Sequence, residues 1–91
     1  MGVYVDTPVA YNEEPKGYVG RARRQHRWGH MIADTEAELH AMAQAIGLRR
    51  AWFQGNHYDL VPSKRMLAIR RGARPVDRRE FIAVLRRVRA T

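Results

Sequence analysis

The chain has 91 residues, a formal net charge of +8 and a pI near 11.0, and it contains no cysteine. This length predicts a single domain over residues 1–91, and a hydrophobic fraction of 45% argues against disorder. The lack of cysteine excludes disulfides, zinc–thiolate sites and a thiol nucleophile. No apolar run approaches the roughly 20 residues of a membrane helix, and no signal-peptide pattern is present, so we expect a cytoplasmic protein without membrane contact.

Arginine supplies most of the positive charge. Of the 17 basic residues, only Lys16 and Lys64 are lysine. The planar guanidinium group matches phosphate oxygens in pairs, so the composition predicts a nucleotide or nucleic acid as the partner. The arginine preference of a GC-rich genome explains the same composition without any ligand, and both interpretations stay open.

The N-terminal third predicts one strand and one long loop. Val3-Tyr4-Val5 is β-branched and aromatic, which is typical of a strand, and it ends at Asp6. Residues 8–29 have no clean period and predict a long basic loop, partly mobile. Trp28 and His26 lie among the arginines at its end, where they could stack a base and contact a phosphate chain. A solvated arm explains this end equally well.

Capping signals predict the first two helices. Thr35 with Glu38 three residues later forms a capping-box pattern, and Gly47 is a natural stop. The second helix is expected to begin at Ser63 as the N-cap, to run to residue 71 and to stop at Gly72. We also expect a buried strand over residues 30–33, another over residues 51–53 and a brief extended piece over residues 74–76.

Asp77 with Glu80 repeats the capping pattern and opens a third helix. Its two faces differ: one carries Phe81, Val84, Leu85 and Val88, and the other carries Arg78, Arg79, Arg86, Arg87 and Arg89. Alternating strands and helices predict a small single-domain α/β sandwich with a short, mostly parallel sheet and about three helices. In such sheets, ligands bind at the carboxyl ends of the strands. This rule predicts that Asp6, Asp34, Gln54 and His57 share one rim.

Several short motifs together resemble a known family. They are Val3-Tyr4-Val5-Asp6, Trp28-Gly29-His30-Met31-Ile32-Ala33-Asp34-Thr35, Glu38-Leu39-His40, His57-Tyr58-Asp59, Arg71-Gly72-Ala73 and Arg79-Glu80. In this order they resemble the bacterial and phage domain-of-unknown-function family 4031, over nearly the whole chain. The resemblance implies a compact domain and carries no activity. The chain departs from the family pattern over residues 8–27, where its loop is longer and more basic.

The stretch from Gln54 to Arg65 holds an imidazole, a phenol, a carboxylate, amides and two cations within one turn. Loops at the ends of rigid elements often carry function. We therefore predict a phosphodiester- or nucleotide-directed site, a small histidine-based phosphodiesterase or nuclease if it is a hydrolase. Histidine transfers protons near neutral pH, so His57 would act as base or acid and His30 as its counterpart.

The predicted catalytic residues are His30, Asp34, His57 and Asp59. The predicted substrate-binding residues are Asp6, Trp28, Gln54, Tyr58, Lys64 and Arg65. Lys64 and Arg65 would stabilise phosphoryl charge at the start of a helix. Structural roles explain several of these residues without catalysis: a satisfied buried imidazole at His30, helix opening at Asp34, and turn formation at Asp59. For His40, packing or hydrogen bonding is the favoured interpretation.

No cofactor is predicted, but a divalent metal stays an alternative, because His30, Asp34, His57 and Asp59 offer nitrogen and oxygen ligands. No tight ligand signature such as His-Glu-x-x-His is present. Two other classes of function remain. One is a non-catalytic protein that sequesters a nucleotide or RNA, as small phage anti-defence proteins do; the other is a protein-interaction module. A 91-residue chain has a small hydrophobic core, which favours a homodimer, although no sequence feature establishes the oligomeric state.

Overall fold

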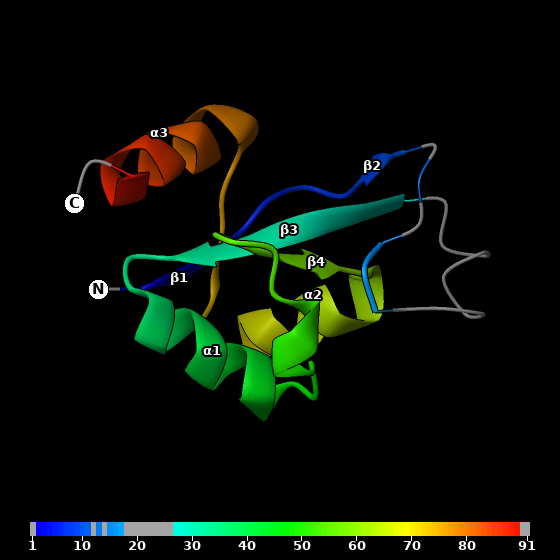
Figure 1. The fold of residues 1–91 in the computed structure, drawn as a ribbon. Helices are drawn as coiled ribbons and strands as arrows, with labels where there is room; N and C mark the ends of the chain where they lie inside the picture. Colours follow the sequence, from blue (N-terminus) through cyan, green and yellow to red (C-terminus); the bar gives the residue numbers. More distant parts are fainter. Residues whose placement is uncertain (1, 12, 14, 18–26, 90–91) are drawn as a thin grey trace.

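The centre of the sheet is β3 (Arg27–Ala33). In the computed structural model, which describes residues 2–11, 13, 15–17 and 27–89, β3 pairs antiparallel with β1 (Val3–Val5), β2 (Val9–Ala10) and β4 (Tyr58–Leu60). β5 (Arg74–Pro75) pairs with β1 in parallel. The fold is a small compact α/β domain whose sheet is mixed and mostly antiparallel (Figure 1). The prediction of a mostly parallel sheet is wrong.

β1 and β2 pair with successive stretches of β3, and an irregular segment separates them. Val5 pairs with Met31, whereas Val9 pairs with Trp28, so the register changes by one residue across residues 6–8. Such a bulge bends a strand and redirects its side chains. Here it follows β1 at Asp6, whose carboxylate turns toward β3.

Helices cover both faces of the sheet (Figure 1). α1 (Glu36–Ala45) and α2 (Pro62–Arg70) pack on one face, and α3 (Arg78–Arg89) lies on the other. The larger core lies under α1 and α2 and includes Val3, Val5, Met31, Ala33, Leu39, Ala43, Ile46, Leu48, Tyr58, Leu60, Ala68 and Ala73. A smaller core lies under α3 and includes Tyr4, Ile32, Val76, Phe81 and Val84. The smaller core leaves part of the α3 face free for a cleft.

The ends of α1 follow the sequence signals. Thr35 is the N-cap, and its hydroxyl oxygen accepts the backbone N–H of Glu38 at 3.2 Å. Gly47 has a φ of 86°, and the N–H of Leu48 donates to the carbonyl of Ala43 at 2.8 Å. This arrangement is a Schellman motif, in which glycine adopts the left-handed conformation without strain. Both predicted ends are confirmed.

The third helix is also confirmed. Asp77 accepts the backbone N–H of Glu80 through Oδ1 at 2.8 Å, and α3 begins at the next residue, Arg78. Phe81 and Val84 are buried in the smaller core, with Leu85 and Val88 partly buried beside them. The apolar face therefore packs on the sheet, as its spacing predicts.

Other predicted elements are wrong. The expected strand over residues 51–53 is a 3₁₀ turn at Arg50–Trp52, because the aromatic side chains pack against the larger core from an irregular segment. The N-cap of α2 is Val61 instead of Ser63, and Pro62 occupies the first turn. Proline fits there because its missing N–H would have no helical partner.

The segment 8–29 is not one loop, since β2 and the first three residues of β3 lie within it. The basic cluster Arg21, Arg23 and Arg24, with His26, lies outside the described residues. Within the described part of the chain, no helix is long and apolar enough to cross a membrane.

Candidate functional site

Three side chains meet on the face of the sheet that α3 leaves partly open. His30 of β3 and Asp59 of β4 are direct cross-strand partners. His57 lies two residues before Asp59, and alternate residues of an extended chain share a face. The ring centroids of His30 and His57 are therefore only 5.2 Å apart, with an edge-to-face arrangement. Strand pairing thus brings the two histidines together.

Asp6 holds His30 in place by two hydrogen bonds. Its Oδ1 accepts the backbone N–H of His30 at 2.6 Å, and its Oδ2 accepts ring Nδ1–H at 2.9 Å. Burial alone would lower the pKa of His30. The hydrogen bond and negative charge of Asp6, with the charge of Asp59, outweigh burial and raise the pKa above its ordinary value. Because Asp6 occupies Nδ1, Nε2 is the nitrogen of His30 left for other contacts.

His57 is held in the same way by different partners. Its Nδ1 donates to Asn56 Oδ1 at 2.7 Å, and its Nε2 lies 3.3 Å from Asp59 Oδ1. Both histidines thus have Nδ1 bound to a side-chain oxygen. The two rings are oriented through one nitrogen each, and Nε2 of His57 faces the carboxylate of Asp59.

Asp59 is the most enclosed member, with 6% of its surface exposed. Its Oδ2 accepts the backbone N–H of Lys16 at 2.8 Å. Burial would raise the pKa of Asp59, but hydrogen bonds from His57, Lys16 and Gln54, together with the charge of His57, outweigh burial and lower it. The group therefore remains a carboxylate and carries a fixed negative charge into the site.

Beside the histidines lies an open cleft of about 300 Å³, lined by His30, Ile32, Asn56, His57, Phe81 and Leu85. The apolar side chains come from β3 and α3, and the polar ones come from β3 and the segment before β4. An aromatic pair flanks His30 on another side: Tyr11 and Trp28 have ring centroids 4.4 Å apart, and Trp28 lies 5.4 Å from His30. Trp28 is buried, whereas Tyr11 is 37% exposed.

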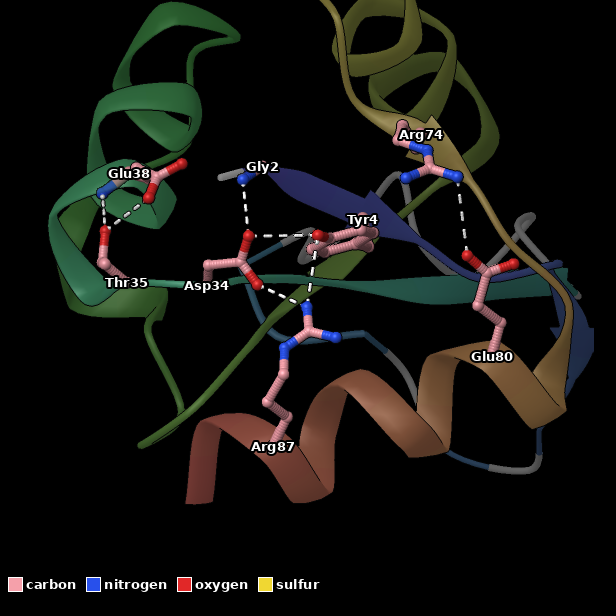
Figure 2. A network of polar contacts seen from close by, with 8 residues as sticks. All are labelled: Gly2, Tyr4, Asp34, Thr35, Glu38, Arg74, Glu80 and Arg87. Atoms are coloured by element: carbon pink, nitrogen blue, oxygen red, sulfur yellow. Dashed lines mark hydrogen bonds and ion pairs between the residues drawn. The ribbon is translucent and has the colours of Figure 1, made fainter. Parts of the chain in front are cut away.

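Asp34 does not join this cluster. Its carboxylate accepts the backbone N–H of Gly2 at 2.7 Å, the hydroxyl of Tyr4 at 3.0 Å and the guanidinium of Arg87 at 2.6 Å (Figure 2). β1 and β3 are antiparallel, so their carboxyl ends, which precede Asp6 and Asp34, lie at opposite ends of the pair. The expectation that Asp6 and Asp34 share one rim is therefore wrong, because it assumed parallel strands.

Two further predicted residues also lie elsewhere. Lys64 donates to the carbonyl of Ile46 at 2.9 Å, at the end of α1. Tyr58 is buried on the opposite face of the sheet, and its hydroxyl donates to His40 Nδ1 at 2.8 Å. His40 Nε2 in turn lies 3.2 Å from Glu36, so its expected hydrogen-bonding role is confirmed. Neither predicted substrate contact is in the cleft.

The remaining predicted residues surround the histidine pair. Trp28 lies beside His30, Gln54 bonds Asp59, and Arg65 donates through Nε to the backbone carbonyl of Asp6 at 2.9 Å. Sequence reasoning missed Tyr11 and Asn56. Asn56 lies within the predicted stretch, next to His57 in the sequence, whereas Tyr11 reaches His30 only because β2 pairs with β3.

Three groups could together hold a metal ion. One ligand atom from each of His30, His57 and Asp59 lies within 4.8 Å of the other two. Two imidazole nitrogens and one carboxylate oxygen suit zinc, iron or manganese. Asp34, which sequence reasoning placed in the same ligand set, lies outside this group.

The comparisons with known proteins identify the family. A family model described as "Protein of unknown function (DUF4031)" matches residues 3–88, which is nearly the whole chain. Comparisons with curated proteins and with solved structures give no match. The matched range includes Asp6, His30, His57 and Asp59. The chain belongs to the DUF4031 family.

Proposed function

We propose that the cleft beside His30 and His57 binds the phosphoryl group of a phosphodiester or nucleotide and hydrolyses it. The observation that carries this proposal is the pair of imidazoles with centroids 5.2 Å apart, each next to a carboxylate. Structural histidines need one partner each, and folding does not require two of them beside one open cleft. Their convergence is typical of a site that moves protons or binds a metal.

The charge of the chain supports an anionic substrate. A net charge of +8 on 91 residues favours association with polyanions and speeds their approach. Arg65 is half-buried next to Asp6. Arg78, at the start of α3, is near enough to Tyr11 for its positive charge to lower the pKa of the Tyr11 hydroxyl, although burial, the larger effect, raises that pKa. Neither cation lines the cleft, but each lies next to a residue that contacts His30, so their charge favours an anion there.

The same side chains support hydrolysis in either of two ways. Without an ion, His57 takes a proton from the attacking water as its oxygen bonds to phosphorus, and protonated His30 gives a proton to the leaving oxygen as the other P–O bond breaks. With a divalent ion, the imidazoles and Asp59 would hold the ion, and the ion would lower the pKa of a bound water. In both mechanisms, Asp6 orients His30. Both mechanisms also require the two imidazole rings to act together.

A second candidate function is binding without cleavage. The cleft volume of about 300 Å³ is at the small end of ligand sites, and the exposed Tyr11, whose ring packs at a tilt against Trp28, offers a surface for a base. In this case the imidazoles only hydrogen-bond the phosphate. A protein of this kind would sequester a nucleotide or RNA.

Product analysis separates the two functions. Tag-free protein is incubated with linear and cyclic dinucleotides and with short RNAs, once with a divalent metal and once with EDTA. Hydrolysis supports catalysis if His57→Ala abolishes it and His40→Gln, a matched histidine change outside the cleft, does not. Intact nucleotide recovered at one equivalent supports sequestration. A protein that neither binds nor cleaves any of these compounds would contradict both functions.

A further inference from the structure

We propose that His30, His57 and Asp59 form a binding site for one divalent transition-metal ion, with Asp6 and Asn56 as the outer partners that orient the two imidazoles. This inference concerns the same cleft as the proposed function and adds a resident ion to it. It stands on geometry that does not depend on any substrate.

The two imidazole rings are oriented as metal-binding histidines usually are. A histidine that binds a metal through one nitrogen usually donates the N–H of the other to a carboxylate or carbonyl oxygen. Nδ1 of His30 donates to Asp6 at 2.9 Å, and Nδ1 of His57 donates to Asn56 at 2.7 Å. Nε2 is therefore the nitrogen of each ring that no outer partner holds, on side chains that share one face of the sheet, and in His57 this nitrogen already faces Asp59.

Two of the ligand atoms already have the spacing of a metal site. Nε2 of His57 lies 3.3 Å from Asp59 Oδ1, and an ion bound here would replace this contact by one bond to each atom, with the Nε2 proton released to water. Zinc bonds of about 2.0–2.1 Å at a tetrahedral angle separate two ligand atoms by roughly 3.4 Å, which agrees with the observed spacing.

The site is held by backbone structure on one side and is open on the other. His30 and Asp59 are fixed by the β3–β4 pairing, and Asp59 Oδ2 is bound by Lys16 N–H. The side chains of His30 and His57 remain 23% and 26% exposed at the cleft. Three protein ligands with an open fourth position are typical of catalytic metal sites, where water or substrate completes the coordination.

The donor set predicts which ions bind. Two nitrogens and one oxygen suit Zn²⁺, Co²⁺, Fe²⁺ or Mn²⁺, whereas Mg²⁺ and Ca²⁺ prefer oxygen ligands alone. We therefore expect one Zn²⁺ or Co²⁺ per chain, and no displacement of either by millimolar Mg²⁺.

The test is calorimetric titration of Zn²⁺ into tag-free, chelator-treated protein, with Co²⁺ absorption as a second readout. Wild type should bind one ion, and Asp59→Asn should weaken binding by more than about 100-fold, beyond the usual loss from an outer partner. His57→Ala serves as a second variant on a more exposed residue. Asp34→Asn is the matched carboxylate control and should bind as wild type does; circular dichroism verifies that each protein is folded.

The absence of one-to-one binding by wild type, or equal affinity in Asp59→Asn and wild type, would overturn the metal site. An equal loss in Asp34→Asn would also overturn it, because the loss would then not be specific to the cluster. Metal binding without hydrolysis of any phosphodiester would leave this inference standing and contradict the catalytic proposal. Hydrolysis by protein that binds no metal would overturn the metal site and leave the catalytic proposal standing.

Discussion

Asp6 binds His30 twice, through the backbone N–H at 2.6 Å and through ring Nδ1 at 2.9 Å. The bond to the backbone N–H lies at a point along β3 where β1 has already ended and β2 has not yet begun to pair with it. One carboxylate therefore completes the strand pairing and fixes the imidazole. Asp6 thus links the irregular segment after β1 to the orientation of His30.

Replacing Asp6 by asparagine keeps the size of the side chain and removes its charge. We expect Asp6→Asn to lower the free energy of unfolding by about 1–3 kcal/mol, because a hydrogen bond to a charged group is weakened in a half-buried place. Turnover or metal affinity should fall about 10–100-fold, as is usual for outer partners of a functional histidine. Urea denaturation and the assays above measure both effects. Unchanged function in a destabilised protein would limit Asp6 to a structural role.

Gly29 offers an independent route to the same contact. A Cβ at this position would overlap Asp6 Oδ1, so Gly29→Ala should displace the carboxylate from His30. We expect a loss of about 1–3 kcal/mol in the wild-type background. In an Asp6→Ala background the space is empty, and the same substitution should cost less than about 0.5 kcal/mol. Equal losses in both backgrounds, measured by urea denaturation, would show that Gly29 is needed for another reason.

The ion pair of Asp34 and Arg87 should give stability that depends on pH (Figure 2). The hydrogen bond from Arg87, helped by Tyr4 and Gly2, outweighs desolvation and lowers the pKa of Asp34 below its usual 3.8. A lowered carboxyl pKa contributes stability above pH ~4, and this contribution disappears as the pH falls through the folded-state pKa. The difference in unfolding free energy between wild type and Arg87→Gln should therefore be full at pH 6 and should shrink as the pH falls below 3.8 toward 2.

This ion pair is exposed on the arginine side, where 58% of the Arg87 side chain is accessible. Salt screens exposed charges, so the same difference should shrink when denaturation at pH 6 is repeated in 1 M NaCl. A difference that persists undiminished at pH 2 would mean that Arg87 stabilises α3 through packing instead of charge.

Tyr11 is the exposed member of the aromatic pair beside His30. If a nucleobase stacks there, Tyr11→Ala should weaken dinucleotide binding by about 1–3 kcal/mol, the usual contribution of one base on one ring. Tyr11→Phe keeps the ring and should bind within about two-fold of wild type. Fluorescence titration measures both affinities. Equal weakening in the two variants would assign the effect to the hydroxyl and not to stacking.

Much of the local structure could be predicted from the sequence. Signals carried by one residue and its close neighbours succeeded, such as the cap at Thr35, the stop at Gly47 and the apolar face of α3. These features depend on interactions within a few residues. The pairing of the sheet depends on contacts between distant segments. The alternation of strands and helices suggested that β1 and β3 run parallel, whereas they are antiparallel, and β4 was not predicted at all.

The candidate site was only partly predicted, because it too depends on contacts between distant segments. His30, His57 and Asp59 stood out as reactive groups at the ends of apolar segments, and the structure brings them together. Asp34 was misplaced because the rule for carboxyl ends applies to parallel strands. Tyr11 was missed because its role depends on the β2–β3 register, which no local pattern reveals.

The most direct test of the account is a double-substitution cycle of turnover for His30→Ala and His57→Ala on the best phosphodiester substrate. Two groups that act on one reacting centre give losses that are far from additive, so the double variant should be about as slow as the slower single variant. Losses that multiply would show that the histidines work independently. Wild-type turnover in either single variant would contradict the account altogether.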